Sequence, residues 1–261
     1  MAVWDNPDVG LLYEINGLAK DAPTWTDRLM EWVGEYGIAV GLVLVGIWAW
    51  WGVSRKRESR DEAVAGFAGL LWAPLAAVIA LVVNIPIRGF VERPRPFLDH
   101  KSVEPLIDGK TDYSFVSDHA TLTMAIAVGI FMVNRKFGLA AILLAVAEGF
   151  CRVYMGVHYP TDVVGGLALG TAVALLLAPA AMWVLTPAVR VASGRAAWLN
   201  TLVWAGPASA RPAGAQAGRG SAGASGASGA ERARTGGDGT DGRTARGSAS
   251  RRGSGDRDLA A

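Results

Sequence analysis

Cysteine is almost absent from this chain of 261 residues, in which Cys151 is the only one. A single cysteine excludes a fold that depends on internal disulfide bonds. Histidine is nearly as scarce, with three residues at positions 100, 119 and 158. Aromatic residues are missing from residues 206–261, which are almost entirely Gly, Ala, Ser, Arg, Asp and Thr. Such a segment has too little apolar surface to fold, and we expect a disordered tail there.

An excess of positive charge is also missing from most of the chain. The net charge is +2, but the tail holds nine arginines against five acidic residues, which leaves −2 for residues 1–205. No basic face therefore indicates nucleic-acid binding. The chain is instead rich in apolar sequence, with 51% hydrophobic residues, ten tryptophans and a mean hydropathy of +0.29 despite the polar tail. This composition excludes an ordinary soluble enzyme and indicates an integral membrane protein.

Long apolar runs alternate with polar loops along residues 38–185. A membrane-spanning helix needs about 20 apolar residues, and five runs approach that length. The runs cover residues 38–53, 63–87, 119–133, 139–150 and 163–185. We therefore predict an all-α fold, a polytopic membrane helical bundle of about five spans.

The same pattern predicts how the chain is divided. Residues 1–37 place apolar and charged residues at helical spacing, with Trp25 and Trp32 on one face, which predicts amphipathic helices in the membrane interface. A soluble cap is the alternative for this segment. The further divisions are a transmembrane core at 38–185, a juxtamembrane segment at 186–205 and the tail at 206–261.

The Lys and Arg residues of the short loops predict the orientation. Residues 54–62 hold four of them and residues 134–138 hold two, on the same side of a five-span bundle. That side is predicted to face the cytoplasm, with the tail, so that residues 88–118 and 151–162 face outward from the inner membrane. The arginines within 88–118 run against this rule, which makes them functional candidates.

Several residues in the outward segments have side chains suited to phosphate chemistry. Arg88, Arg95 and Arg152 can clamp a phosphate group by planar, charge-assisted hydrogen bonds. Ser117 and the first amides of the following helix add donors at a helix N-terminus, where anions bind favourably. The arginines would then supply the stabilisation of negative charge that a metal supplies in other enzymes. No cluster has the ligands of a metal site, and we expect no cofactor.

The two histidines beside these groups permit a division of labour. One can attack phosphorus while the other protonates the departing oxygen. Asp162 follows His158 by four residues and can accept the second ring N–H of that histidine. Glu148 precedes Arg152 by four residues, and we expect it to pair with this arginine and position it, in preference to a direct part in catalysis.

Each candidate taken singly also has a structural explanation. Arginines near the ends of spans commonly extend to lipid head groups, and a histidine or aspartate at a helix start is commonly a cap. The occurrence of all eight candidates in three ordered motifs favours one shared site.

Those three motifs resemble the signature of the type 2 phosphatidic acid phosphatase superfamily, whose members are metal-independent membrane phosphatases. The motifs are Arg88-x6-Arg95-Pro96, Ser117-x-His119 and Arg152-x5-His158-x3-Asp162. The resemblance implies that His158 is the nucleophile that forms a phosphohistidine, that His119 is the general acid, and that Asp162 orients His158. It also implies a set of phosphate-binding residues, namely Arg88, Arg95, Ser117, the amide of Asp118, and Arg152.

Over about residues 8–185, the chain further resembles the bacitracin-resistance type of undecaprenyl-diphosphatase. The supporting sequences are Glu14-Ile-Asn-Gly17, Arg-Pro-Arg-Pro-Phe97 and His158-Tyr-Pro-x-Asp162. This resemblance implies hydrolysis of a polyprenyl diphosphate, undecaprenyl diphosphate, to undecaprenyl phosphate and phosphate. Such a reaction recycles the lipid carrier of cell-wall synthesis and lowers sensitivity to bacitracin.

Four positions depart from the superfamily pattern. Arg88 stands where Lys is usual, Val116 replaces Pro, Asp118 replaces Gly, and Cys151 replaces Ser. Asp at position 118 is typical of the undecaprenyl-diphosphatase branch. Replacement of Ser by Cys151 removes a hydroxyl donor from the expected phosphate contacts.

Three alternatives remain beside this interpretation. The substrate can be phosphatidate, phosphatidylglycerol phosphate or another prenyl diphosphate, and the phosphoryl group can pass to an acceptor other than water. A third alternative is a non-catalytic membrane scaffold that recruits partners through its tail, against which the intact His119, His158 and Asp162 argue. The sequence is compatible with a homo-oligomer and identifies no partner for the tail.

Overall fold

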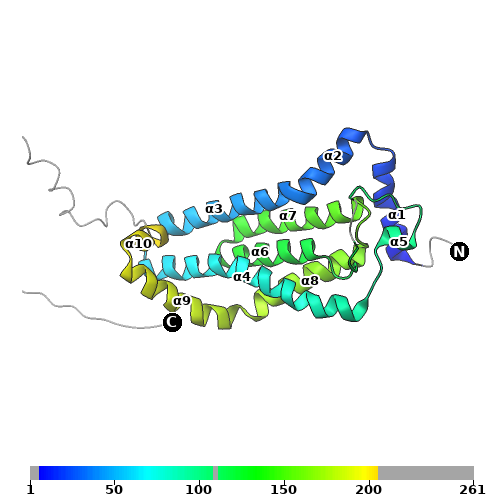
Figure 1. Ribbon diagram of the computed structural model, residues 1–261. Coiled ribbons are helices and arrows are strands. Elements are labelled where there is room, and N and C mark those ends of the chain that lie inside the picture. Colours follow the sequence, from blue (N-terminus) through cyan, green and yellow to red (C-terminus); the bar gives the residue numbers. More distant parts are fainter. Residues whose placement is uncertain (1–5, 108–110, 205–261) are drawn as a thin grey trace, which may run out of the picture. The chain divides into compact units, whose positions relative to one another are not determined.

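The computed structural model describes residues 6–107 and 111–204, and this part of the chain is helical with no strand (Figure 1). Eleven helical elements follow one another along the described residues. They are α1 (Pro7–Lys20), α2 (Thr24–Trp32), the π-helix η2 (Val33–Gly37), α3 (Ile38–Lys56), α4 (Arg60–Val91), α5 (Pro96–Asp99), α6 (Asp118–Val133), α7 (Arg135–Tyr154), α8 (Pro160–Leu176), α9 (Ala178–Arg195) and α10 (Ala197–Val203).

Helix α6 lies between α4, α7 and α8 and packs against all three. Glycines allow the close approach. A Cβ atom on Gly129 of α6 would lie 2.6 Å from Cα of Ala73 in α4, and one on Gly170 of α8 would lie 2.4 Å from the carbonyl oxygen of Thr121 in α6. Small residues at such contacts are typical of helices that associate within a membrane, where close packing replaces the hydrophobic driving force.

Three helical stretches are long and apolar enough to cross a membrane, namely Thr24–Lys56, Arg60–Asp99 and Arg135–Tyr154. Helices α8 and α9 meet at a bend of 53° and count as a fourth span if the pair crosses as one. Helix α6, the predicted span at 119–133, has 16 residues and falls short of the same length. The predicted all-α membrane bundle is confirmed, with three to four spans of sufficient length and α6 as a shorter apolar helix among them.

Polar side chains end the helices at sharp turns. The side-chain oxygen of Asn134 accepts hydrogen bonds from the amides of Lys136 and Phe137, so Asn134 alone separates the end of α6 from the start of α7. Nη2 of Arg57 donates to the carbonyl oxygen of Val133 at 3.3 Å. This bond places the α3–α4 turn beside the α6–α7 turn, so the two basic loops 54–62 and 134–138 lie at one end of the helices.

The predicted division of the chain stays a prediction, and the structure adds detail to it. The boundary at 37–38 falls inside the continuous helical stretch Thr24–Lys56. Helix α1 packs against α7 and α8, at the opposite end from the basic loops. Helix α10 is held on α3 by the indole N–H of Trp50, which donates to the carbonyl oxygen of Leu202 at 3.0 Å. The predicted tail at 206–261 lies outside the described residues.

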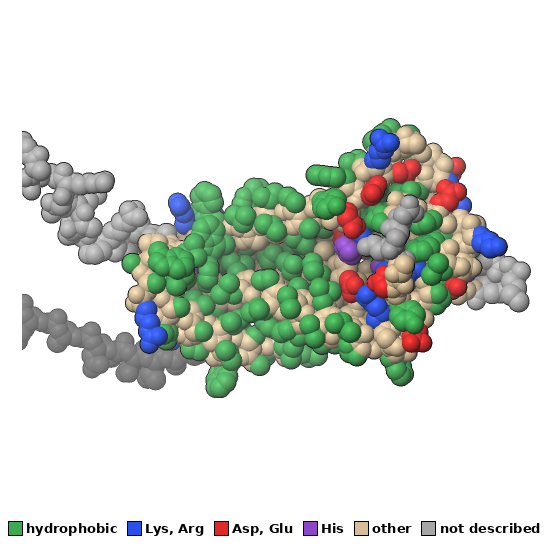
Figure 2. Space-filling model, in the orientation of Figure 1, with side chains coloured by type: hydrophobic (Ala, Val, Ile, Leu, Met, Phe, Trp, Pro, Cys, Tyr) green, Lys and Arg blue, Asp and Glu red, His purple; other side chains and the backbone are tan. Residues whose placement is uncertain are grey.

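Side-chain chemistry differs along the helices (Figure 2). Hydrophobic side chains cover the middle of the visible face, and acidic and basic side chains gather at the end where α1 and α5 lie. Many of the exposed apolar residues are large, including Trp48, Trp51, Ile85 and Trp183. An apolar belt of this kind suits contact with lipid tails, and the charged end suits the membrane surface.

Candidate active site

Four segments meet at the charged end of the bundle. They are the C-terminal end of α4, the loop that follows it to residue 117, the start of α6, and the turn from α7 into α8. The predicted site residues all lie on these segments. Their contacts form two groups, one around His158 and one around Arg152.

The imidazole of His158 lies in the turn between α7 and α8 and is 4% exposed. Its Nδ1 lies 2.9 Å from the carbonyl oxygen of Ser114. Because a carbonyl oxygen only accepts, Nδ1 carries the proton, and Nε2 keeps its lone pair in the neutral ring. Nε2 lies 3.4 Å from Nη1 of Arg95. The ring therefore presents an unprotonated nitrogen beside a guanidinium group.

Asp162 is fully buried in the first turn of α8 and is shared among three groups. Its Oδ2 accepts the amide N–H of Tyr159 at 2.9 Å, and its Oδ1 accepts from Nη1 of Arg93 at 2.8 Å. The distance from Oδ2 to Nδ1 of His158 is 3.7 Å. The predicted partner of His158 is therefore near the ring, but the carbonyl oxygen of Ser114 is the nearer acceptor.

Arg88 and Arg95 converge on one carboxylate, that of Asp112. Nη1 of Arg88 lies 2.7 Å from Oδ2 of Asp112, and Nη2 of Arg95 lies 2.7 Å from Oδ1. Nε of Arg95 also donates to the carbonyl oxygen of Asp112, and Nη1 donates to that of Val157, both at 3.0 Å. Two arginines of the predicted phosphate clamp are thus brought together around an anion supplied by the protein.

The start of α6 lies against Arg88. Nη2 of Arg88 forms a salt bridge with Oδ2 of Asp118, and the amide of Asn84 donates to Oδ1 at 2.7 Å. Ser117 is fully buried and caps α6, and its own amide donates to the carbonyl oxygen of Asp162 at 3.1 Å. This last bond ties the start of α6 to the start of α8. Nε of Arg88 is buried and has no hydrogen-bond partner among the described residues.

Arg152 forms a second group with two carboxylates. Its Nε lies 2.6 Å from Oε1 of Glu148, as the spacing of four residues predicts, and its Nη1 lies 2.8 Å from Oε2 of Glu35 in η2. Its Nη2 donates to the carbonyl oxygen of Gly34. The side chain is 1% exposed. A guanidinium group has five N–H donors, so Arg152 retains two beyond these three contacts.

His119 is the second residue of α6 and is half-buried. It follows Ser117 and Asp118 directly, so the backbone places it at the helix start that is tied to Asp162. Its carbonyl oxygen accepts from the hydroxyl of Thr123 at 2.7 Å. The predicted general acid therefore lies on the segment that joins the Arg88 and His158 contacts.

Burial and nearby charge set the protonation states of His158 and Asp112 at the site. Burial is the main cause that lowers the pKa of His158 below its ordinary value of 6.5, and the positive charges of Arg95 and Arg152 add to the effect against the opposing influence of Asp162. Burial raises the pKa of Asp112, but the hydrogen bond and charge of Arg95 outweigh it and leave the pKa below its usual value. At neutral pH the histidine is uncharged and the aspartate is ionised.

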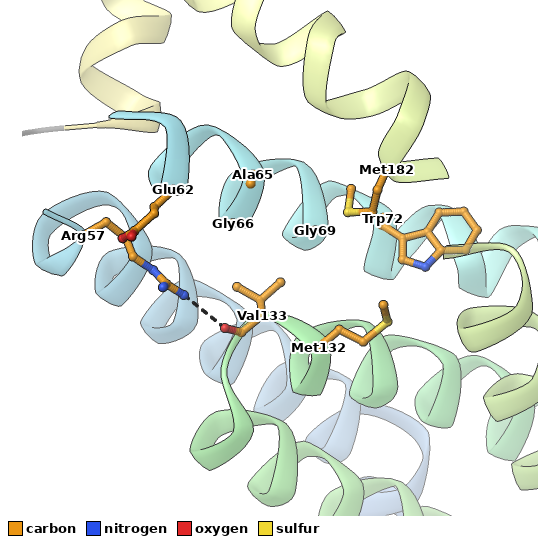
Figure 3. Close-up of a pocket in the computed structure, with 9 residues that line it drawn as sticks. All are labelled: Arg57, Glu62, Ala65, Gly66, Gly69, Trp72, Met132, Val133 and Met182. Carbon is orange, nitrogen blue, oxygen red and sulfur yellow. Dashed lines mark hydrogen bonds between the residues drawn. The ribbon is translucent and has the colours of Figure 1, made fainter. Parts of the chain in front are cut away.

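Two other features of the described residues bear on the chemistry. No group of three or more His, Cys, Asp or Glu side chains within 6–107 and 111–204 is arranged to hold a metal ion. A cavity of about 280 Å³ lies at the opposite end of the helices, and its lining includes Arg57, Glu62 and Trp72 (Figure 3). Its lining includes no histidine, serine or cysteine, and none of the eight predicted site residues.

Several residues of the site were not predicted from the sequence. Asp112 and Ser114 lie in a loop without periodic pattern, and Glu35 lies 117 residues before its partner Arg152. Arg93 appeared only among the arginines that oppose the orientation rule and within the sequence Arg-Pro-Arg-Pro-Phe97, and no role was predicted for it. The position of Arg93 between Arg88 and Arg95, in a loop rich in arginine, was the one available signal.

Comparisons with known proteins show which proteins the chain is similar to. The model of the PAP2 superfamily matches residues 69–185, which contain all eight predicted site residues. The undecaprenyl-diphosphatase BcrC of Bacillus subtilis is 32% identical over 151 residues, which cover 58% of this chain and 72% of that protein. A decaprenylphosphoryl-5-phosphoribose phosphatase of Mycobacterium tuberculosis is 31% identical over 174 residues, which cover 65% and 88%.

One solved structure, a PAP2-type phosphatidylglycerolphosphate phosphatase from Bacillus subtilis, is 22% identical with a TM-score of 0.47, and the match covers 69% of this chain and 88% of that one. The identity to BcrC over nearly three quarters of its length decides the family. The chain belongs to the PAP2 superfamily.

Proposed function

We propose that the chain is a metal-independent lipid phosphatase that hydrolyses undecaprenyl diphosphate to undecaprenyl phosphate and inorganic phosphate. One observation carries the proposal. The Nδ1 proton of His158 is held by the carbonyl oxygen of Ser114, so that Nε2 keeps its lone pair next to Arg95. A buried, neutral histidine with a fixed tautomer beside a phosphate-binding cation is suited to nucleophilic attack on phosphorus.

In the first chemical step, the lone pair of His158 Nε2 attacks the terminal phosphorus. The new N–P bond forms as the bond from phosphorus to the bridging oxygen breaks, and undecaprenyl phosphate departs with that oxygen. His119 gives its proton to the departing oxygen. Arg88 and Arg95 hold the terminal phosphoryl oxygens, where negative charge increases in the transition state.

In the second step, water attacks the phosphorus of phosphohistidine. His119, now neutral, takes a proton from that water, and the N–P bond breaks to release inorganic phosphate. The electron pair returns to Nε2 of His158, and His119 is protonated again. Ser114 and Asp162 hold the Nδ1 edge throughout, which stabilises the positively charged ring as it develops.

A groove beside the arginines supports a lipid substrate. It has a volume of about 390 Å³ and is lined by four apolar residues of α4, Val78, Leu81, Val82 and Ile85, together with Arg88 and Asp118. Valines and isoleucine of this set are exposed on the membrane-facing surface. A prenyl chain lying along α4 would bring its diphosphate to Arg88 without leaving the apolar layer.

A second candidate is hydrolysis of a prenyl-linked phosphate monoester. The decaprenylphosphoryl-5-phosphoribose phosphatase of Mycobacterium tuberculosis favours it, because this relative is 31% identical to the chain, against 32% for BcrC. The chemistry at His158 is the same in both cases, since only the leaving group differs. Attachment of the phosphate to a lipid is common to both candidates.

Phosphate release from the purified full-length protein tests the choice of substrate. Undecaprenyl diphosphate, a polyprenyl phosphoribose 5-phosphate, phosphatidate and phosphatidylglycerol phosphate should be compared at equal concentration in detergent. We expect the highest kcat/KM with undecaprenyl diphosphate and no release with a His158→Ala variant. His100→Ala is the matched control at the same end of the bundle, and it should retain most of the activity. A higher kcat/KM with another lipid would transfer the proposal to that lipid class.

The proposed recycling of the lipid carrier requires the site to face outward from the inner membrane, with the tail in the cytoplasm. Exposed lysines mark the two ends, Lys101 at the site end and Lys136 at the other. Single Lys101→Cys and Lys136→Cys variants can be treated in intact cells with a maleimide that does not cross membranes. Cys151 is buried and should give little background. Labelling of the first variant alone agrees with the proposal, and labelling of the second alone would overturn it.

A further inference from the structure

We propose that Arg93 is a positioning residue for His158, because it holds both of the groups that face the Nδ1 edge of that ring. The catalytic part of this inference rests on the proposed function, and the positional part rests on the contacts alone. Arg93 is not one of the residues of the three motifs. It lies in the loop after α4, between Glu92 and Pro94.

The side chain of Arg93 holds Asp162. Nη1 of Arg93 lies 2.8 Å from Oδ1 of Asp162, while the other carboxylate oxygen, Oδ2, faces the amide of Tyr159 and Nδ1 of His158. Asp162 is fully buried, and an unpaired carboxylate there would be costly. Arg93 therefore fixes the rotation of this carboxylate and reduces the negative charge that reaches His158.

The main chain of Arg93 holds Ser114. The amide of Ser114 donates to the carbonyl oxygen of Arg93 at 2.8 Å, and the carbonyl oxygen of the same serine accepts the Nδ1 proton of His158. The hydroxyl of Ser114 also donates to the carbonyl oxygen of Pro94, at 3.1 Å. The acceptor that sets the tautomer of His158 is thus anchored to Arg93 and the residue after it.

A third set of contacts ties Arg93 to the N-terminal helix. Nη2 of Arg93 lies 2.6 Å from Oδ2 of Asp8 at the start of α1, and Nη1 also donates to the hydroxyl of Thr161 at 2.7 Å. Asp8 in turn accepts the amide and the hydroxyl of Thr161, at 2.9 and 2.7 Å. The guanidinium carbon lies 3.6 Å from the centre of the Tyr159 ring.

These contacts leave Arg93 a different role from that of the phosphate clamp. Both of its terminal nitrogens are engaged by Asp8, Thr161 and Asp162, and one face is covered by Tyr159. Burial raises the pKa of Asp8, but hydrogen bonds from Arg93 and Thr161 outweigh it and leave that pKa below its usual value. Asp8 is therefore ionised at neutral pH and competes with Asp162 for the charge of Arg93.

The competition predicts opposite effects for two substitutions. Arg93→Met leaves Asp162 with its full charge beside His158, so the pKa of His158 should rise. Asp8→Asn removes the carboxylate that competes for Arg93, so Arg93 neutralises more of the charge of Asp162 and the pKa of His158 should fall. Both variants retain the other charged groups that lower the pKa of His158, namely Arg95 and Arg152.

The test uses two measurements on the full-length protein in detergent. NMR titration of labelled histidine follows the ring of His158 directly, since the chain has only three histidines. The pH profile of kcat/KM for undecaprenyl diphosphate gives the functional counterpart. Arg93→Lys keeps the positive charge but replaces the planar guanidinium, which donates from two terminal nitrogens, with a single ammonium group. Lys101→Met is the matched control, because it removes a positive charge from the same loop.

The expected result is a higher pKa of His158 in Arg93→Met and a lower one in Asp8→Asn, with Lys101→Met unchanged. We also expect kcat in Arg93→Met to fall about 10- to 100-fold, as with other residues that orient a reacting group, with little change in KM and partial recovery in Arg93→Lys. An unchanged pKa of His158 in Arg93→Met, or an equal shift in Lys101→Met, would overturn the inference. If wild-type protein releases no phosphate, the proposed function fails, while the NMR shifts still decide the role of Arg93.

Discussion

His158 donates its Nδ1 proton to the carbonyl oxygen of Ser114 at 2.9 Å, ahead of the Asp162 carboxylate, whose nearer oxygen lies at 3.7 Å. A main-chain acceptor cannot rotate away or become protonated at ordinary pH, so this bond fixes the tautomer of the neutral ring. Asp162 is then left to supply negative charge near the ring and to cap α8 through the amide of Tyr159. The histidine, just before α8, and the aspartate, in the first turn of α8, thus lie close together without forming a simple pair.

The low pKa of His158 predicts the acid side of the pH profile. Burial disfavours the charged ring, so Nε2 remains unprotonated below the ordinary pKa of 6.5. In wild-type protein, the protonation of His158 should cause no decrease in kcat/KM as pH falls from 7 to about 6.5, and a decrease should appear only below about 6.5. A decrease with its midpoint above 6.5 would contradict a buried, neutral nucleophile.

The same group should make the stability of the fold depend on pH. His158 binds a proton more weakly in the folded state than in the unfolded state, so its contribution is present above pH 6.5 and is lost as pH falls through and below that value. Thermal unfolding of wild type and His158→Gln in detergent measures this. The difference in pH dependence between the two proteins should lie below pH 6.5, and an equal dependence would contradict the assignment.

Asp112 contacts both Arg88 and Arg95, the arginines proposed to bind phosphate, and its removal should favour the binding of anions. In Asp112→Asn, Arg88 and Arg95 lose a carboxylate that competes with the phosphoryl group. We expect KM and the inhibition constant of inorganic phosphate to fall about 3- to 10-fold, up to about 1.4 kcal/mol, because the carboxylate is partly exposed. Asp99→Asn, an exposed residue in the same region, should leave both constants unchanged. A rise in KM for Asp112→Asn would show that the carboxylate organises the arginines instead.

The Arg152 cluster should matter to folding as well as to activity. Glu148→Gln leaves the buried guanidinium with one carboxylate fewer, and breaking such a buried pair costs about 3–5 kcal/mol. Glu35→Gln removes the partner from η2, which is partly exposed, and should destabilise the protein less. Chemical unfolding in detergent compares them with Glu31→Gln, an exposed glutamate on α2. Equal stability of Glu148→Gln and the control would refute the importance of this cluster.

Close packing of α6 and α8 can be tested at one glycine. Gly170→Ala would place a Cβ 2.4 Å from the carbonyl oxygen of Thr121, so the helices must move apart, at a cost of about 1–3 kcal/mol. Gly17→Ala in α1 is the matched control, because no atom lies within 4 Å of the added Cβ. That variant should be neutral or slightly stabilised, since alanine favours helix. An unchanged thermal midpoint for Gly170→Ala would refute tight packing at this contact.

Local patterns predicted those parts of the molecule that depend on neighbouring residues. The apolar runs predicted the membrane helices, although the run at 163–185 is divided by the bend between α8 and α9, close to Pro179. The spacing of Glu148 and Arg152 predicted their salt bridge, which is observed at 2.6 Å. Each of these features is set by helix periodicity, which a sequence displays directly.

Such local patterns could not predict the contacts that the loop after α4 makes. Asp112 and Ser114 are brought to Arg95 and His158 by an irregular segment, whose course depends on where α4, α6 and α8 end. Glu35 contacts Arg152 because η2 packs beside the end of α7, although the two residues are 117 positions apart in the sequence. Pairing of this kind follows from tertiary packing, so the residues can be recognised only when the fold is known.

The proposed mechanism requires that His158 forms a covalent bond to phosphorus without help from a metal. The most direct measurement is rapid quenching of the full-length protein with undecaprenyl diphosphate labelled in its terminal phosphate, in the presence of EDTA. We expect protein-bound label that survives base and is lost in acid, as a phosphohistidine is, and that is missing from His158→Ala. Turnover that stops in EDTA, or label that persists in His158→Ala, would contradict it.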